Sequence, residues 1–143
     1  MNFKKHAHQL ETFLEEEFKQ KLPIALLPDG ALAYNGFVVK KNKKDQWQLS
    51  RAKGLPFDTF NVKSCAIIAA KLYGASRFEK YSELKILDDL YHKNHTDAVI
   101  FKQRYTTAKD LDKRDLYVAR YINAEQHANY AKSQIASKFK MLF

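Results

Sequence analysis

The sequence predicts an α+β protein, in which a small antiparallel sheet precedes a helical C-terminal half. Short β-prone runs alternate with Asp-Gly and Asn-Gly pairs between residues 24 and 60, and helical periodicity appears on both sides of that region. The chain has 143 residues, of which 45% are hydrophobic and 29% charged, as is typical of one globular domain. We therefore expect a single domain over residues 1–143, with an N-terminal helix (1–22), a β-meander plus helix (23–75) and a helical region (76–143).

An amphipathic helix is expected over residues 1–22. Its apolar side chains recur at roughly helical spacing, with four glutamates between them, at Phe3, Leu10, Phe13, Leu14 and Phe18. Pro23 ends this helix because proline breaks the hydrogen-bonding pattern.

A meander of three to five strands is expected next. The pairs Asp29-Gly30 and Asn35-Gly36 tolerate the positive φ that tight hairpins need. Pro56 is compatible only with a strand start or a sheet edge. Alternation along QWQLS places Trp47 and Leu49 on one face, with Gln46, Gln48 and Ser50 on the other.

Helices are expected over residues 61–73, 77–91, 96–105 and 109–140. Asn61 is the predicted N-cap of the first, and Gly74 its left-handed C-cap. The stripe of Cys65, Ile68, Ala69 and Leu72 is expected to press an unreactive thiol against Trp47 and Leu49.

The last predicted helix carries an apolar stripe of ~36 Å, which a small globule buries with difficulty. We therefore expect a homo-oligomer through residues 118–142, with an antiparallel hairpin within one chain as the alternative.

Basic residues gather around the predicted meander. The chain carries a formal charge of +9, and residues 37–81 hold ten Lys and Arg against three Asp and Glu. Clustered cations bind phosphates, and glutamine can read adenine in a major groove. The predicted nucleic-acid site, with DNA expected rather than RNA, consists of Lys40, Lys41, Lys43, Lys44, Gln46, Gln48, Arg51 and Lys53. The alternative is that these lysines only solubilise the protein and blunt a sheet edge.

Several short motifs resemble those of a known domain: Tyr34-Asn35-Gly36-Phe37, Trp47, Asp58-Thr59-Phe60-Asn61, Ala69-Ala70 and Tyr73. Their order resembles the plant ethylene-response-type DNA-binding domain, which also occurs in integrase arms. The resemblance implies a three-stranded sheet in the major groove, backed by a helix. Asn35 and Val38 or Val39 stand where that family has base-contacting arginines, so the implied DNA role falls to the hairpin lysines and Trp47.

The whole chain is similar to small uncharacterised proteins of marine tailed phages, through LPDGALAYNGFVVKK, KSCAIIAAKLY and YSELKILDDLY. This resemblance implies a phage-encoded protein, in the host cytoplasm or the virion, and brings no assigned activity. Together with the basic meander it leads us to expect a nucleic-acid-binding phage accessory protein. Two alternatives to nucleic-acid binding stay open. One is a virion or assembly protein that self-associates through its C-terminal helix, and the other is an inhibitor of a host protein with an acidic surface.

Catalytic motifs are not legible in the sequence, so neither enzymatic activity nor a cofactor is expected. Asp88, His92 and His95 form the one metal-like cluster, but their spacing fits a helix end better, and no metal is predicted. No run of about 18 apolar residues suggests a membrane span.

Overall fold

The computed structural model describes residues 24–139, and the helix predicted over 1–22 lies outside them. The described chain has the predicted α+β architecture, with one antiparallel sheet followed by helices. The strands, in their order across the sheet, are β1 (Ala25–Leu26), β2 (Leu32–Tyr34), β3 (Phe37–Lys41), β4 (Trp47–Arg51) and β5 (Pro56–Phe60). The helices are α2 (Lys63–Gly74), α3 (Phe78–Thr107) and α4 (Leu111–Phe139).

The hairpin turns form where the sequence predicts them. Asn35 and Gly36 take φ values of 55° and 82° between β2 and β3, as a tight hairpin demands. The turn between β3 and β4 closes through Asn42, whose Oδ1 accepts hydrogen bonds from the Lys44 and Gln46 amides. Pro56 begins the edge strand β5, so its missing amide hydrogen costs the sheet little.

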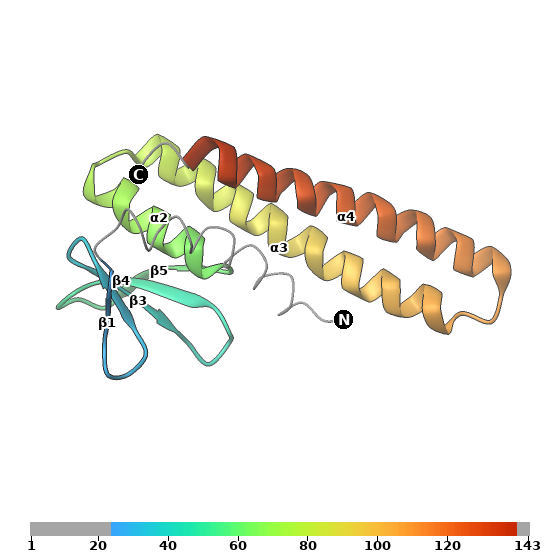
Figure 1. Cartoon of the computed structure of the whole chain (residues 1–143), viewed down its shortest axis with the longest axis horizontal. Coiled ribbons are helices and arrows are strands. Elements are labelled where there is room, and N and C mark those ends of the chain that lie inside the picture. Colours follow the sequence, from blue (N-terminus) through green and yellow to red (C-terminus); the bar gives the residue numbers. More distant parts are fainter. Residues whose placement is uncertain (1–23, 140–143) are drawn as a thin grey trace.

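The elements pack in layers, with α2 between the sheet and the hairpin of α3 and α4 (Figure 1). Eight residues of α2 are buried: Ser64, Cys65, Ala66, Ile67, Ile68, Ala69, Ala70 and Leu72. The single predicted stripe is therefore too narrow, because α2 is covered from two sides. Its alanines allow close approach of neighbouring elements.

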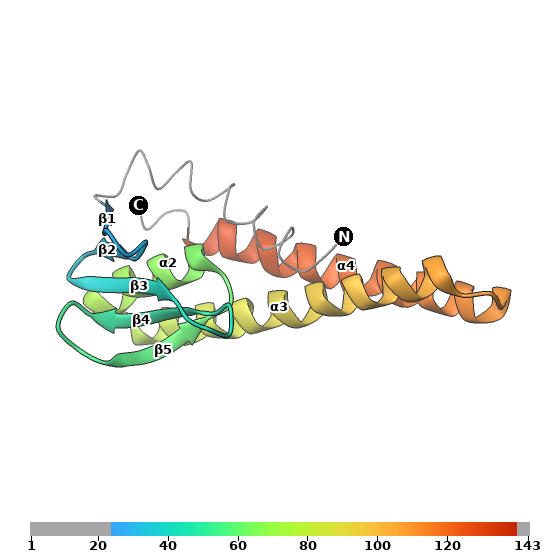
Figure 2. The same cartoon turned by 90° about the horizontal axis from the view of Figure 1, so that it is seen from below.

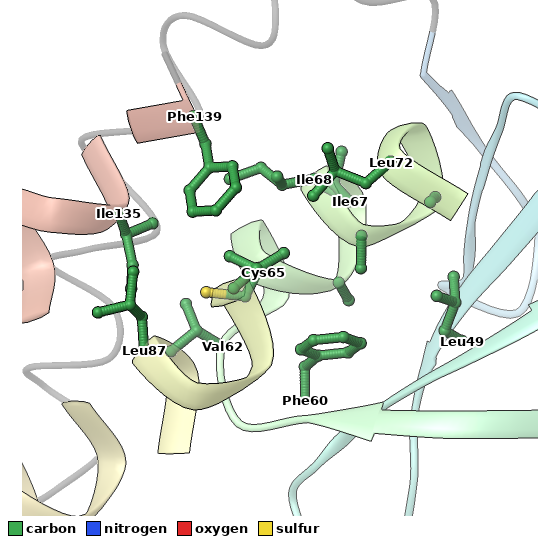
Figure 3. Close-up of a cluster of buried hydrophobic side chains, with 14 of the residues drawn as sticks. Leu49, Phe60, Val62, Cys65, Ile67, Ile68, Leu72, Leu87, Ile135 and Phe139 are labelled. Carbon is green, nitrogen blue, oxygen red and sulfur yellow. The ribbon is translucent and has the colours of Figure 1, made fainter. Parts of the chain in front are cut away.

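Cys65 is fully buried, as predicted, but its surroundings differ from the expectation. Figure 3 shows the sulfur on the side of Leu87 and Ile135, away from Leu49. The thiol therefore belongs to the layer between α2 and the helical hairpin, and not to the layer between α2 and the sheet.

The helical half is an antiparallel hairpin of two long helices (Figure 2). The predicted interruption between residues 91 and 96 is wrong, since α3 continues from Phe78 to Thr107. Tyr91, His95 and Ala98 lie on one buried face of α3, so tertiary packing extends the helix through a polar stretch. Asn94 donates its side-chain amide to the Leu90 carbonyl within that helix.

The apolar stripe of α4 is covered within the chain over much of its length. Its buried residues are Ala124, Ala128, Ala131, Ile135 and Phe139. The expected difficulty of burying this stripe within one chain does not arise at these residues, because α3 has 30 residues against 29 in α4 and runs alongside it. No helix within residues 24–139 is long and apolar enough to cross a membrane.

Candidate nucleic-acid interface

The two faces of the sheet have different roles. Helices α2, α3 and α4 all lie on one side of it, where Val39 and Leu49 are buried (Figure 1). The strand register places the alternate side chains on the opposite side, where Lys40, Gln48 and Thr59 are cross-strand neighbours. We call this side the open face, and it consists of Val38, Lys40, Gln48, Ser50 and Thr59. The predicted separation of Gln48 and Ser50 from Trp47 and Leu49 is confirmed.

The lysine turn, which we define as residues 42–45 between β3 and β4, lies at one end of the open face. Lys43 and Lys44 are exposed and form no ion pair within residues 24–139. Lys40 lies 3.3 Å from Asp29, and its ammonium and that carboxylate are both more than half exposed. Exposed pairs of this kind contribute little free energy, so a phosphate can replace the carboxylate.

Lys41 and Trp47 lie on the helix side of the sheet. They are register neighbours, and the Lys41 ammonium is 5.8 Å from the centroid of the Trp47 ring. Trp47 is half-buried against the core. Neither side chain belongs to the open face, which removes Trp47 as a contact for a ligand bound there.

Gln46 precedes β4 and is half-buried beside the lysine turn. Its carbonyl accepts the Asn42 amide at 2.8 Å, which closes the turn. Since it lies two residues before Gln48, its side chain shares the open side of the sheet.

Arg51 and Lys53 lie at the other end of β4. Arg51 is paired with Phe37 in the register, and its guanidinium is 5.5 Å from the ring centroids of both Phe37 and Tyr73. The five residues of β4 span about 17 Å, so the predicted site divides into two separate groups of cations. The sequence places these residues close together in the chain, whereas the extended strand separates them in space.

A cluster of aromatic side chains lies beside Arg51, and the sequence analysis missed it. Rings of Phe57 and Tyr73 have centroids 4.8 Å apart, and those of Tyr73 and Phe78 are 5.4 Å apart. Leu49 and Ser50 of β4 pair with Asp58 and Pro56 of β5, so Phe57 has no partner in the register. This irregularity of the strand turns the Phe57 ring toward Tyr73 of α2. We call Arg51, Phe57, Tyr73, Arg77 and Phe78 the aromatic end. No local pattern in the sequence signals it, because three separate segments supply the rings.

Contacts between β5 and α3 hold the aromatic end in place. Asp58 accepts a hydrogen bond from the Tyr81 hydroxyl, and its other oxygen lies 3.1 Å from the Lys85 ammonium. Burial and this hydrogen bond raise the pKa of Tyr81. These contacts position the first turn of α3, and with it Phe78, against the sheet.

The buried polar residues of α3 have a structural role. Asp88 is fully buried. Its carboxylate accepts hydrogen bonds from the backbone amides of Asn61 and Val62, at 2.8 and 3.1 Å, and from the Cys65 thiol. Burial raises the pKa of Asp88 to about 6. His95 stacks on Tyr91, and burial lowers the pKa of His92. Within residues 24–139 no three His, Cys, Asp or Glu side chains gather as a metal site would require.

The arrangement offers a surface of exposed lysines and half-buried amide side chains, with no enclosed reactive centre among the residues discussed above. Comparison with protein-family models, curated proteins and solved structures gave no match. The features of this protein that bear on function are therefore the open face, the lysine turn and the aromatic end.

Proposed function

We propose that this protein is a non-enzymatic nucleic-acid-binding protein that uses the open face of its sheet and the lysine turn. The observation that carries the proposal is the arrangement of the open face. Gln48, Ser50 and Thr59 lie across its middle, exposed lysines lie at one end, and all described helices pack on the opposite side. Such a surface supplies both phosphate contacts and hydrogen-bonding groups for base edges.

Duplex DNA fits this surface better than duplex RNA. The major groove of B-form DNA is wide enough for a small sheet, whereas that of A-form RNA is deep and narrow. Within the five-stranded sheet, β3, β4 and β5 are backed by α2, and this is the arrangement that we propose enters the groove. In the phage setting suggested by the sequence, the protein acts in the host cytoplasm as an accessory protein.

The test compares two double charge reversals that alter net charge equally. Lys43→Glu/Lys44→Glu changes the lysine turn, while Lys109→Glu/Lys113→Glu changes exposed lysines at the tip of the helical hairpin. Fluorescence anisotropy with a labelled duplex of about 20 base pairs at ~50 mM and ~200 mM salt measures affinity and its salt dependence.

We expect the lysine-turn variant to lose at least about tenfold in affinity and to show a shallower salt slope than the parent. The tip variant loses much less. Equal losses of affinity in both variants would show that binding depends on the overall charge of the protein and not on the lysine turn. Absence of parent binding at micromolar protein and ~50 mM salt would refute the proposed function.

A second candidate function is self-association of a virion or assembly protein. Exposed apolar side chains on the hairpin favour it, since Ile86 is 66%, Leu111 69% and Ile122 48% exposed. These residues lie outside the internal contact of α3 with α4. Sedimentation equilibrium of the parent and of Ile122→Asp tests it, because the variant should have the lower mass if this surface joins two copies.

A further inference from the structure

We infer that the aromatic end is a second nucleic-acid subsite, which stacks unpaired bases of a single strand. This inference rests on the proposed function, because it refines which form of nucleic acid the protein binds. It concerns a different surface, since the aromatic end lies on the helix side of the sheet and at the opposite end of β4 from the lysine turn.

The rings of the aromatic end form a continuous surface that reaches solvent. Phe57 is 42% exposed and Phe78 53% exposed, and Tyr73 lies between them in contact with both. The Tyr73 ring is also in edge contact with Phe37 and Tyr81, which are anchored in the core. Phe57 and Phe78 are thus held by inner rings, and their exposed parts are available to a ligand without rearrangement of the core.

Cations border these rings. The Arg51 guanidinium lies over Phe37 and Tyr73, and Lys53 and Arg77 are exposed on the adjoining loops. A depression of about 410 Å³ beside Phe78 is lined by Ser76, Arg77, Phe78, Glu79 and Lys80. The surface therefore combines apolar ring faces with positive charge, and Glu79 is the acidic residue of its lining.

This combination matches an anionic strand with exposed bases. Aromatic rings bind the faces of unstacked bases, while arginine and lysine hold the phosphates. In an intact duplex the base faces are covered by neighbouring base pairs and cannot reach the rings. An uncharged apolar partner would form no ion pairs with the bordering cations. The chemistry of the aromatic end thus favours a single strand over an intact duplex and over an apolar partner.

The test uses the full chain and three labelled ligands. These are an oligothymidine of about 12 nucleotides, an abasic strand with the same number of phosphates, and a duplex of the same length. The test variant is Phe57→Leu/Phe78→Leu, which keeps apolar volume and removes two ring faces. Leu55→Ala is the matched control, because Leu55 is 87% exposed just before β5, two residues from Phe57, and has no ring.

We expect the parent to bind oligothymidine at least about tenfold more tightly than the abasic strand, a difference that the Phe57→Leu/Phe78→Leu variant largely loses. Its duplex affinity should change by less than about twofold, and Leu55→Ala should resemble the parent. If circular dichroism shows that the double variant is unfolded, Phe78→Leu alone serves, since Phe78 is half-exposed at the start of α3.

Equal affinity of the parent for the two single strands overturns the inference, as does undiminished oligothymidine binding by the leucine variant. If duplex binding persists and depends on Lys43 and Lys44, the proposed function stands while this inference fails. If none of the three ligands binds, both fail.

Discussion

The carboxylate of Asp88 on α3 accepts a hydrogen bond from the backbone amide of Val62, 3.1 Å away, at the start of α2. It also accepts the Asn61 amide, at 2.8 Å. The cap that the sequence assigns to Asn61 therefore comes from another helix. Amide groups at a helix start lack partners within the helix, and Asp88 satisfies them while fixing α3 against α2.

Asp88→Ala should lower the free energy of unfolding by about 2–4 kcal/mol, because it leaves amides of Asn61 and Val62 without their acceptor in the core. Asp89→Ala is the control, since Asp89 is exposed and accepts one bond of 3.2 Å from the Asn61 side chain. We expect its effect to stay below about 0.5 kcal/mol. Chemical denaturation measures both, and equal losses would contradict the capping role.

The raised pKa of Asp88 predicts a pH-dependent stability. Its folded value of about 6 lies above the ordinary 3.8, so between these pH values the folded state binds more protons than the unfolded state. The contribution of Asp88 to stability is therefore greatest below about pH 4 and falls by about 3 kcal/mol as pH rises through 6.

Denaturation of the parent and Asp88→Asn between pH 4 and 7 isolates this effect, because the variant cannot titrate at that position. The stability of the parent relative to the variant should decrease with rising pH. The lowered pKa of His92 makes the protein more stable as pH rises, but this effect is the same in the parent and the variant and cancels in the comparison. A constant or rising difference would show that Asp88 is ionised throughout.

Ser76→Gly should stabilise the protein by about 0.5–1 kcal/mol. Ser76 has a φ of 57° just after α2. There the Arg77 amide donates a hydrogen bond to the Leu72 carbonyl at 2.9 Å, and the Ser76 amide donates one to the Tyr73 carbonyl at 3.0 Å. This helix ending favours glycine at the left-handed position. Ser82→Gly, on an exposed turn within α3, should destabilise by a similar amount, and thermal melting distinguishes the two signs.

Cys65 should react slowly with a disulfide reagent in the native protein and completely in denaturant. Its thiol is fully buried and donates a hydrogen bond to Asp88, so a reagent cannot reach the sulfur in the folded protein. Cys65→Ala should cost about 1 kcal/mol or somewhat more without loss of nucleic-acid binding. Rapid native labelling would contradict the burial, and a stable but non-binding alanine variant would assign the thiol a functional role.

Substitutions of two isoleucines of α4 should differ in their effect on stability. Ile135→Ala should cost about 2–5 kcal/mol, because Ile135 is fully buried between the hairpin and α2. Ile122→Asp should change stability little, since Ile122 is 48% exposed. If the parent forms oligomers in sedimentation equilibrium, Ile122→Asp should lower their mass. A monomeric parent across the micromolar range would exclude self-association.

Hairpins and strand faces were predictable from the sequence because their causes are local. Asn35 and Gly36 adopt the positive φ that their side chains permit, and the two-residue period of a strand separates Gln48 from Leu49 whatever packs on the sheet. Helical periodicity likewise indicated α2 and α4 close to their observed limits.

Tertiary packing decided the features that join distant segments. It carries α3 through His92 and His95, brings Asp88 to the start of α2, and covers Ile135 within one chain. Each depends on free energy gained between residues far apart in sequence, which overrides the weak local preferences for a helix end or a cap.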